Sequence, residues 1–391
     1  MSSNWNVVPF TEAVDICDTL RKPINSSERA SRIKGKEQSE LYPYYGATGQ
    51  VGFIDDYITD GEYVLLGEDG APFLDAFSKK AYIISGKTWV NNHAHVLKSK
   101  TNNKFLCYYL NSFNYKGYVS GTTRLKLTQA EMKRIPVPVP PLSEQERIVA
   151  RIEELFSQLD AGVETLKKTK AQLAVYRQAA ITEAFSVDNN TPNVCLSDIA
   201  QLIGGITKGR DLSGTETIEL PYLRVANVQN GYLDLSEIKT IKLRVDEKER
   251  YLLKPGDVLY TEGGDRDKLG RGTVWRGEIK DCVHQNHIFK ARVDQSKAIP
   301  EYVAFWSMST PARNYFYQKG KQSVNLASIN KTVLSALTLP LPALEKQREI
   351  INHIESRLSV CDSIEQTADI ALQQAEAMRQ SILKDAFEGN L

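Results

Sequence analysis

Two stretches of the chain carry apolar residues at alternating steps of four and three, the spacing of a helix with a single apolar seam. Each follows a run with proline at every second position, which a helix does not tolerate, so we expect the helices to begin near Leu142 and Leu344. The predicted seam residues are Ile148, Ile152, Leu155, Leu159, Leu166, Leu173, Tyr176 and Ala180 in the first stretch, and Ile350, Ile354, Cys361, Ile364, Ala368, Ala371, Ala375, Met378 and Ile382 in the second.

These two stretches are copies of one another. Residues 138–185 align with residues 340–387 without a gap at a constant offset of 202, and 15 of the 48 positions are identical. A helix of this length is a rod of roughly 65 Å, too long to bury its seam in one small core. We therefore predict that the two helices pair as an antiparallel coiled coil. The alternative is two ordinary amphipathic helices in separate cores.

The segments before the two helices contain short β-rich runs separated by turns. The first has EYVLLGEDGA, KAYIISGKTWV and HAHVLKS, then a predicted helix at residues 103–111. The second repeats this order with KPGDVLYTEGG, HQNHIFKAR and a predicted helix at residues 300–309. We predict an α+β chain with pseudo-two-fold character, in which two tandem mixed β-rich globular domains are separated and held by the paired helices. The boundaries are 1–140, 141–187, 188–340 and 341–391.

Charge is distributed unevenly along these segments. The chain has 49 basic and 48 acidic residues, a net charge of +1. Residues 1–140 carry 17 basic against 14 acidic side chains and residues 188–340 carry 21 against 18, whereas both helices are acidic. Each globular domain is therefore +3. This asymmetry permits anionic partners at the globular domains.

Membrane insertion and secretion are not expected from this sequence. No run of 18 apolar residues occurs, and the N-terminus lacks the pattern of a signal peptide. The five cysteines are scattered and form no CxxC pair. We therefore expect a reduced, cytoplasmic protein without a membrane partner.

Several loose motifs for catalysis or cofactor binding can be weighed and set aside. Residues 81–88, AYIISGKT, fit a nucleotide-binding loop, but the loop itself favours a strand and a strand-like run follows where a helix is needed. Asp257 with Glu278 and Lys280 has the layout of a metal-dependent nuclease. However, the first domain has no counterpart to Glu278 and Lys280, which favours a simple turn.

Metal binding and methyl transfer are also disfavoured. Cys282, His284 and His287 could bind a metal, as could the pair His93 and His95, but no fourth ligand is evident. Neither an (N/D)PP(Y/F) motif nor a glycine-rich cofactor loop for base methylation occurs. The sequence therefore predicts no catalytic, cofactor-binding or metal-binding residues in this chain.

The order of these features resembles the DNA specificity subunit of type I restriction–modification systems. The resemblance covers the whole chain. Its specific part is the pair of helices. Each helix follows a Pro-rich run, begins with EQERI or EKQREI, and ends with RQA or RQSIL followed by AF. It implies that the chain is not an enzyme, that each globular domain is a target recognition domain reading one half of a bipartite, asymmetric DNA site, and that the helices set the spacer. It also implies two methyltransferase subunits that bind S-adenosylmethionine and methylate adenine, to which restriction–translocation subunits can be added.

DNA reading needs basic and amide side chains presented from loops, some to phosphates and some to base edges. The candidates in the first domain are Tyr44, Tyr45, Asn91, Asn92, His93, Arg124 and Lys126. Those in the second are Arg224, Asn227, Arg266, Lys268, Arg271, Asn286, Lys319, Lys321 and Gln322. Two other classes stay open at this point: a protein-interaction scaffold without DNA affinity, and a self-contained metal-dependent nuclease.

Overall fold

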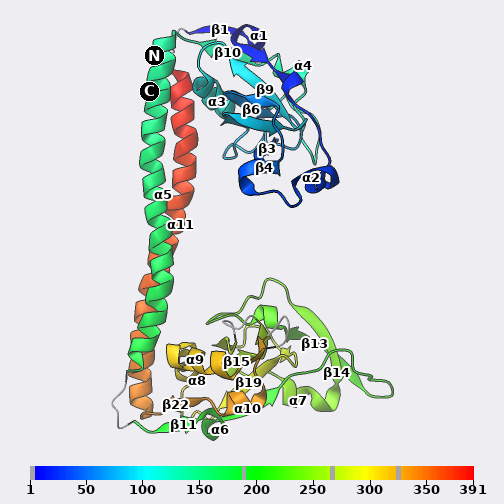
Figure 1. Cartoon of the computed structure of the whole chain (residues 1–391). Coiled ribbons are helices and arrows are strands. Elements are labelled where there is room, and N and C mark those ends of the chain that lie inside the picture. Colours follow the sequence, from blue (N-terminus) through cyan, green and yellow to red (C-terminus); the bar gives the residue numbers. More distant parts are fainter. Residues whose placement is uncertain (1–4, 187–190, 265–268, 323–326) are drawn as a thin grey trace. The chain divides into compact units, whose positions relative to one another are not determined.

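The computed structural model describes residues 5–186, 191–264, 269–322 and 327–391. The chain divides into two compact units (Figure 1). Unit 1 comprises Met1–Lys167 and Ala368–Leu391, and unit 2 comprises Lys168–Thr367. The long helices α5 (Leu142–Ala184) and α11 (Leu344–Glu388) each contribute one part to each unit. Both helices begin where the Pro-rich runs predicted.

Unit 1 contains two four-stranded sheets, ordered β2-β9-β6-β7 and β4-β3-β8-β5. Their strands are β2 (Val14–Ile16), β3 (Tyr42–Gly46), β4 (Gly49–Ile54), β5 (Thr59–Asp60), β6 (Tyr63–Gly67), β7 (Ala81–Ile84), β8 (Lys87–Val90) and β9 (Ala94–Ser99). A further pair joins β1 (Asn6–Pro9) to β10 (Pro136–Val139). The helices are α1 (Phe10–Ala13), α2 (Ser26–Ile33), α3 (Asn103–Ser112) and α4 (Gln129–Met132). Helix α3 packs against β6 and β7 and so closes the core of this unit.

Unit 2 contains sheets ordered β12-β19-β15-β17, β14-β13-β18 and β16-β21-β20, and the pair β11-β22. The strands are β11 (Asn193–Cys195), β12 (Ala200–Gly204), β13 (Thr217–Leu223), β14 (Lys239–Arg244), β15 (Asp257–Thr261), β16 (Gly263–Gly264), β17 (Gly272–Val274), β18 (Val283–His284), β19 (Ile288–Val293), β20 (Lys321–Gln322), β21 (Ala327–Ser328) and β22 (Thr338–Pro340). The helices are α6 (Leu196–Ile199), α7 (Lys248–Tyr251), α8 (Pro300–Met308), α9 (Thr310–Lys319) and α10 (Lys331–Ser335).

The two units share one ground plan. In each, a central buried strand (β6 or β15) lies between a long antiparallel neighbour (β9 or β19) and a shorter one (β7 or β17). A parallel strand pair, β3 with β8 or β13 with β18, lies in a second sheet. The short helices α4 and α10 are capped by the side chains of Thr128 and Asn330, which are 202 residues apart. The sequence repeat therefore extends upstream of the aligned segment into the folded domains.

Helices α5 and α11 run antiparallel within each unit. In unit 1, Asp160 pairs with Arg379, and Arg147 donates to the main-chain oxygen of Leu391. In unit 2, Lys170 lies 3.7 Å from Glu365 and Glu183 2.6 Å from Arg357. In both units the partner number falls as the α5 number rises, which is the antiparallel arrangement predicted. Within the described residues no helix combines the length and apolarity needed to cross a membrane.

The predicted seam was wrong at three positions. Tyr176, Ile364 and Met378 are 44%, 42% and 53% exposed, although each continues the apolar spacing. Tyr176 and Met378 lie near the ends of their helices, where the buried face turns toward the globular core, whereas Ile364 lies in the middle of α11 and its exposure has no such cause. Ile181 and Leu383, which the seam did not include, are buried instead.

Equivalent glutamines fix the start of each long helix to its own domain. The Gln145 amide donates to Pro140 O at 2.9 Å and accepts from the Thr101 hydroxyl at 2.9 Å. Gln347 likewise donates to Pro342 O at 2.8 Å and accepts from Ile299 N at 2.9 Å. Both glutamines are almost fully buried. Because a buried amide is tolerated only when it is hydrogen-bonded, this pair explains one identity in the repeat.

Equivalent phenylalanines fix the ends of the long helices. Phe185, just past the end of α5, packs edge-on against Tyr302 and Trp306 of α8 in unit 2. Phe387 of α11 packs in the same manner against Phe105 and Tyr109 of α3 in unit 1. In each unit, a single short helix therefore anchors the start of one long helix and the end of the other.

Candidate nucleic-acid interface

Three loop segments of unit 1 meet at the end of β6. They are residues 68–70 after β6, residues 91–93 before β9, and residues 120–127, and we call them together the loop edge of unit 1. The Glu68 main-chain N–H donates to His93 O at 2.8 Å, and Leu127 N donates to Glu68 O at 2.8 Å. A bridge joins Asp69 to Lys126. These main-chain bonds hold the three segments in a fixed arrangement.

The predicted cations of unit 1 lie on this edge. Arg124 Nε is 2.7 Å from Asp69 Oδ1, and Lys126 Nζ is 3.6 Å from Glu68 Oε1. His93 Nδ1 is 3.7 Å from Asp69 Oδ2. The side chains of Arg124 and Lys126 remain 60% and 50% exposed, so they are oriented by the carboxylates and accessible to an anion.

The other unit 1 candidates divide into exposed and buried residues. Asn92 is exposed at the turn, whereas Asn91 is buried and its Oδ1 accepts from His93 N at 2.8 Å. Tyr44 is 4% exposed and lies beneath the guanidinium of Arg29, 4.7 Å from its ring centre. Tyr45, half-buried, accepts at its main-chain oxygen from Asn91 N. A hollow of about 180 Å³ opens here, lined by Tyr44, Asn91, Asn92 and His93 among others.

Unit 2 has an equivalent loop edge. Its three segments are residues 262–264 with 269–271, residues 285–287, and residues 319–322 with 327–329. Glu262 N donates to His287 O at 2.9 Å, and Ile329 N donates to Glu262 O at 2.8 Å. These bonds match those of Glu68 in unit 1. The short sheet β16-β21-β20 forms the rest of the edge.

Four unit 2 candidates lie on this edge. Arg271 Nη1 donates to Gln229 Oε1 at 3.3 Å, and Asn286 Nδ2 is 3.5 Å from His287 Nε2. Lys319 and Lys321 are exposed. Arg266 and Lys268 lie outside the described residues, and of Gln322 only the main chain, in β20, is described.

Arg224 and Asn227 have a different position from that expected of base-reading residues. Asn227 is 3% exposed, accepts from Arg224 N, and donates to Asp234 O and Glu237 O. Arg224 Nη2 donates to Glu237 at 2.9 Å. Both therefore hold residues 224–238, the long connection between β13 and β14. Tyr232 within this connection is 61% exposed.

Sequence reasoning missed the acidic members of the two edges, Glu68, Asp69 and Glu262, and the amide of Gln229. A signal was present, because the aligned runs EYVLLGEDGA and KPGDVLYTEGG place Glu68 opposite Glu262. Acidic residues were passed over because a DNA-binding surface is expected to be basic.

The discounted catalytic motifs have structural explanations. Residues 81–88 lie in strands β7 and β8 and their connection, with no following helix to receive a phosphate. The carboxylate of Asp257 is 1% exposed and accepts from Arg292 at 2.8 and 2.7 Å and from Lys254 N at 2.8 Å. It is therefore committed to ion pairing in the core.

The candidate metal ligands are likewise dispersed. His284 is buried between Tyr251 O and Ile203 O, and burial lowers its pKa to about 4. Burial raises the pKa of the Cys282 thiol to about 12. His95 lies in β9 and pairs with Asp18, whereas His93 lies in the preceding turn, so they do not share a strand face. In the described part of the chain, no three His, Cys, Asp or Glu side chains gather as a metal site.

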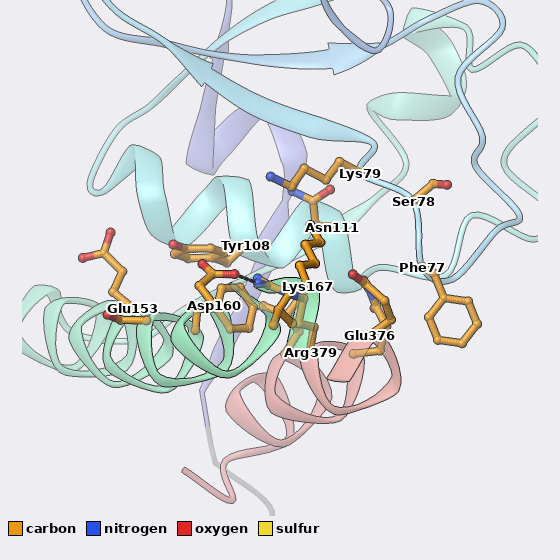
Figure 2. A pocket seen from close by; sticks show the side chains of 15 residues that line it. Phe77, Ser78, Lys79, Tyr108, Asn111, Glu153, Asp160, Lys167, Glu376 and Arg379 are labelled. Carbon is orange, nitrogen blue, oxygen red and sulfur yellow. Dashed lines mark hydrogen bonds and ion pairs between the residues drawn. The ribbon is translucent and has the colours of Figure 1, made fainter. Parts of the chain in front are cut away.

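A hollow of about 770 Å³ lies in unit 1, beside α3, residues 77–79 and the two long helices (Figure 2). Figure 2 shows Asp160 and Arg379 paired at its floor, with Tyr108 above them. Arg379 also lies over Phe156, 4.9 Å from the ring centre. None of the residues lining this hollow belongs to the loop edge. Its walls carry both acids and bases, so it is not a basic groove for a phosphate backbone.

Comparison with known proteins finds relatives that align with most of this chain. A putative type I restriction enzyme specificity subunit of Haemophilus influenzae is 26% identical over 384 residues, covering 94% of this chain and 91% of that protein. The EcoKI specificity subunit of Escherichia coli is 26% identical over 309 residues, covering 73% of this chain and 65% of that protein.

Two solved structures have a similar fold. One is a chain from a study of complex assembly and conformational transition of the type I R-M system, with a TM-score of 0.69 at 17% identity over 99% of this chain and 98% of that one. The other is the HsdS subunit of Thermoanaerobacter tengcongensis, with a TM-score of 0.53 at 15% identity over 100% and 98%. A family model described as the type I restriction modification DNA specificity domain matches residues 3–174 and 189–374. The chain therefore belongs to the family of type I restriction–modification DNA specificity domains.

Proposed function

We propose that this chain is the sequence-specific DNA-binding subunit of a type I restriction–modification complex. Residues 1–140 and 188–340 act as target recognition domains, and each reads one half of a bipartite site. The observation that carries the proposal is the loop edge, which recurs in both units on the same main-chain bonds with different side chains. A conserved frame with altered side chains is the arrangement expected when two domains read two different sequences.

The charges of the edges support contact with DNA. Arg124 and Lys126 in unit 1, and Lys319 and Lys321 in unit 2, are exposed cations beside amide groups that can reach base edges. Cations to phosphates position a protein on the duplex, and amides or carboxylates in the grooves select the sequence. Asn92 and Asn286, at equivalent turns, are the amides placed for base reading in their units.

Catalysis belongs to other subunits. Specificity subunits of this family are the non-catalytic, DNA-recognising components of restriction–modification complexes. We propose that two methyltransferase subunits supply adenine methylation with S-adenosylmethionine in the cytoplasm, with restriction–translocation subunits as further partners. Docking on the helices is supported by their exposed apolar side chains, which are Val175, Tyr176, Val360, Ile364, Ile370 and Met378.

The test is to co-express the chain with the methyltransferase encoded beside it and to map methylated bases across the genome. We expect one split motif with methyl groups in both halves. A stable complex that adds no methylation would favour a scaffold without DNA affinity. Failure of any complex to form would contradict the proposal as a whole.

DNA binding by the assembled complex gives a second measurement. Replacing Arg124 and Lys126 by Ala should weaken binding and make the dependence of log affinity on log salt shallower by about 1–2, because two phosphate contacts are lost. The paired control is Lys34→Ala with Lys116→Ala, two exposed lysines of unit 1 outside the loop edge. An equal change in slope for both pairs would place the DNA on another face.

A further inference from the structure

The glutamate at the centre of each loop edge has the same main-chain role in both units. The N–H and C=O of Glu68 are bonded to His93 and Leu127, and those of Glu262 to His287 and Ile329. Both main-chain groups are thus occupied, and the Cα position of each glutamate is set by two neighbouring segments. What differs between the units is how the carboxylate is used.

In unit 1 the carboxylate of Glu68 is neutralised by the protein itself. It pairs with Arg21, lies 3.6 Å from Lys126 Nζ and 3.9 Å from His95 Nε2, and is 15% exposed. Three basic groups already neutralise this carboxylate, so it does not require a hydrogen-bond donor from the DNA. Glu68 is therefore a structural residue of the edge.

In unit 2 two of those basic groups are replaced. Phe289 stands where unit 1 has His95, because each is the second residue of the strand that pairs with the central strand of its unit. Ser328 stands where unit 1 has Lys126, because each directly precedes the residue whose main-chain N–H donates to the glutamate carbonyl. The carboxylate of Glu262 is 28% exposed and is held by the 53% exposed imidazole of His287, with Nδ1 2.7 Å from Oε2.

The hydrogen-bond geometry fixes the orientation of this carboxylate. When Nδ1 of His287 donates to Oε2, the other oxygen, Oε1, keeps its acceptor capacity. His287 Nε2 can then accept from the Asn286 amide, whose Nδ2 is 3.5 Å away. Asn286, His287 and Glu262 form a row on the loop edge that ends in a carboxylate oriented by its neighbour.

A carboxylate on a DNA-facing edge is repelled by phosphates, so one that is not needed to orient neighbouring cations can contribute by accepting a hydrogen bond from a base. In the major groove the donors are the exocyclic amino groups, N4 of cytosine and N6 of adenine. We infer that Glu262 is a specificity-determining residue that accepts a hydrogen bond from such an amino group in the half-site read by unit 2, with His287 as its positioning residue. This inference rests on the proposed function and assigns one base contact within it.

The test uses the complete complex with its methyltransferase subunits, and variants Glu262→Ala, His287→Ala and Glu216→Ala. Glu216 is an exposed acid directly before β13, outside the loop edge, so its substitution makes the same charge change as a matched control. Affinity is measured for the mapped site, for each single base-pair change within it, and for unrelated DNA. Thermal unfolding of each complex shows whether the variant is folded.

Glu262→Ala removes the acceptor and is expected to lose about 10-fold of the discrimination at a single base pair, because a good base contact contributes about that much. It should also bind unrelated DNA several-fold more tightly, since a repulsive charge is gone. His287→Ala should lose discrimination at the same base pair. The base at that position, cytosine or adenine, identifies the donor. A merely structural role would weaken binding to all DNA alike and would not raise binding to unrelated DNA.

Full discrimination at every position by Glu262→Ala would overturn the inference, as would equal effects of Glu262→Ala and Glu216→Ala. If Glu262→Ala does not fold, His287→Ala decides, because the His287 side chain is half-exposed and its truncation opens no buried cavity. A wild-type complex that selects no split sequence would instead overturn the proposed function, and this inference with it.

Discussion

The guanidinium of Arg177 lies 2.6 Å from the carboxylate of Asp362, joining α5 to α11 in unit 2. Arg379 and Asp160 form the same ion pair in unit 1. Arg379 lies 202 residues after Arg177, and Asp362 lies 202 residues after Asp160. The two pairs are therefore equivalent contacts in which the arginine and the aspartate have exchanged helices. The internal repeat has therefore kept both ends of an interhelical contact, which sets the register of the antiparallel pairing in both units.

Reversing the charge at Arg177 is expected to destabilise the helix pair slightly. Arg177→Glu places an acid beside Asp362 and Glu365, and we expect the free energy of unfolding to fall by about 1 kcal/mol, the upper range for an exposed pair. Adding Asp362→Arg should recover part of this loss. Chemical denaturation of the four proteins of this cycle measures the coupling, and the cycle Arg379→Glu with Asp160→Arg should give a similar value. A double variant less stable than both single variants would contradict the pairing.

Removing a buried glutamine at a helix head is expected to cost more. Gln145→Ala removes a fully buried side chain and leaves the buried Pro140 carbonyl without its donor, so the free energy of unfolding should fall by about 1–3 kcal/mol. Gln347→Ala should behave alike in unit 2. The control is Gln158→Ala, an exposed position on α5. Equal unfolding midpoints for the Gln145 and Gln158 variants would show that the helix head is held by other contacts.

Unit 2 should lose stability on mild acidification because of His284. Burial lowers its pKa to about 4, whereas a histidine in an unfolded chain has a pKa near 6.5. The unfolded chain therefore binds a proton in this window before the folded chain does, and the free energy of unfolding falls as the pH drops, by roughly 1.5 kcal/mol between pH 6.5 and 5.

Denaturation at several pH values measures this slope. In His284→Gln the titrating group is gone and the slope between pH 6.5 and 5 should become shallower by that amount. His353→Gln, at an exposed site on α11, is the control for replacing a histidine at another position. Identical slopes in all three proteins would mean that His284 is accessible to protons in the folded state.

Shortening both long helices should shorten the unread part of the DNA site. Asp160 faces Arg379, so residues 164–167 of α5 lie opposite residues 372–375 of α11, and both can be deleted together. Four helical residues span about 6 Å, the length of about two base pairs of B-DNA. We expect both halves of the motif to remain and the spacer to lose about two base pairs. An unchanged spacer length in the methylation map would show that the length of the helices does not set the spacer.

The repeat, the long helices and α3 and α8 could be predicted from the sequence because they depend on local spacing, proline positions and alignment. The exposure of Tyr176 and Met378 could not, because the buried face of each helix changes where it meets a globular domain.

The candidate site was predictable only in part. Arg124, Lys126 and Asn286 lie on the loop edges, as loop residues of the expected chemistry. Asn227 has the same chemistry but is buried, because its amide holds the connection after β13. Sequence alone does not show which polar loop residue folds inward, since that depends on contacts between segments far apart in the chain. The pairing of Glu262 with His287 is a contact of this kind.

The most direct measurement of the central claim is a methylation map of three complexes: the wild type, the unit 1 variant Arg124→Ala with Asn92→Ala, and the unit 2 variant Arg271→Ala with Asn286→Ala. Two separate reading edges predict a split motif in which the unit 1 changes relax only one half and the unit 2 changes relax only the other. A continuous motif, or changes in either unit that relax both halves equally, would contradict the claim that each unit reads its own half.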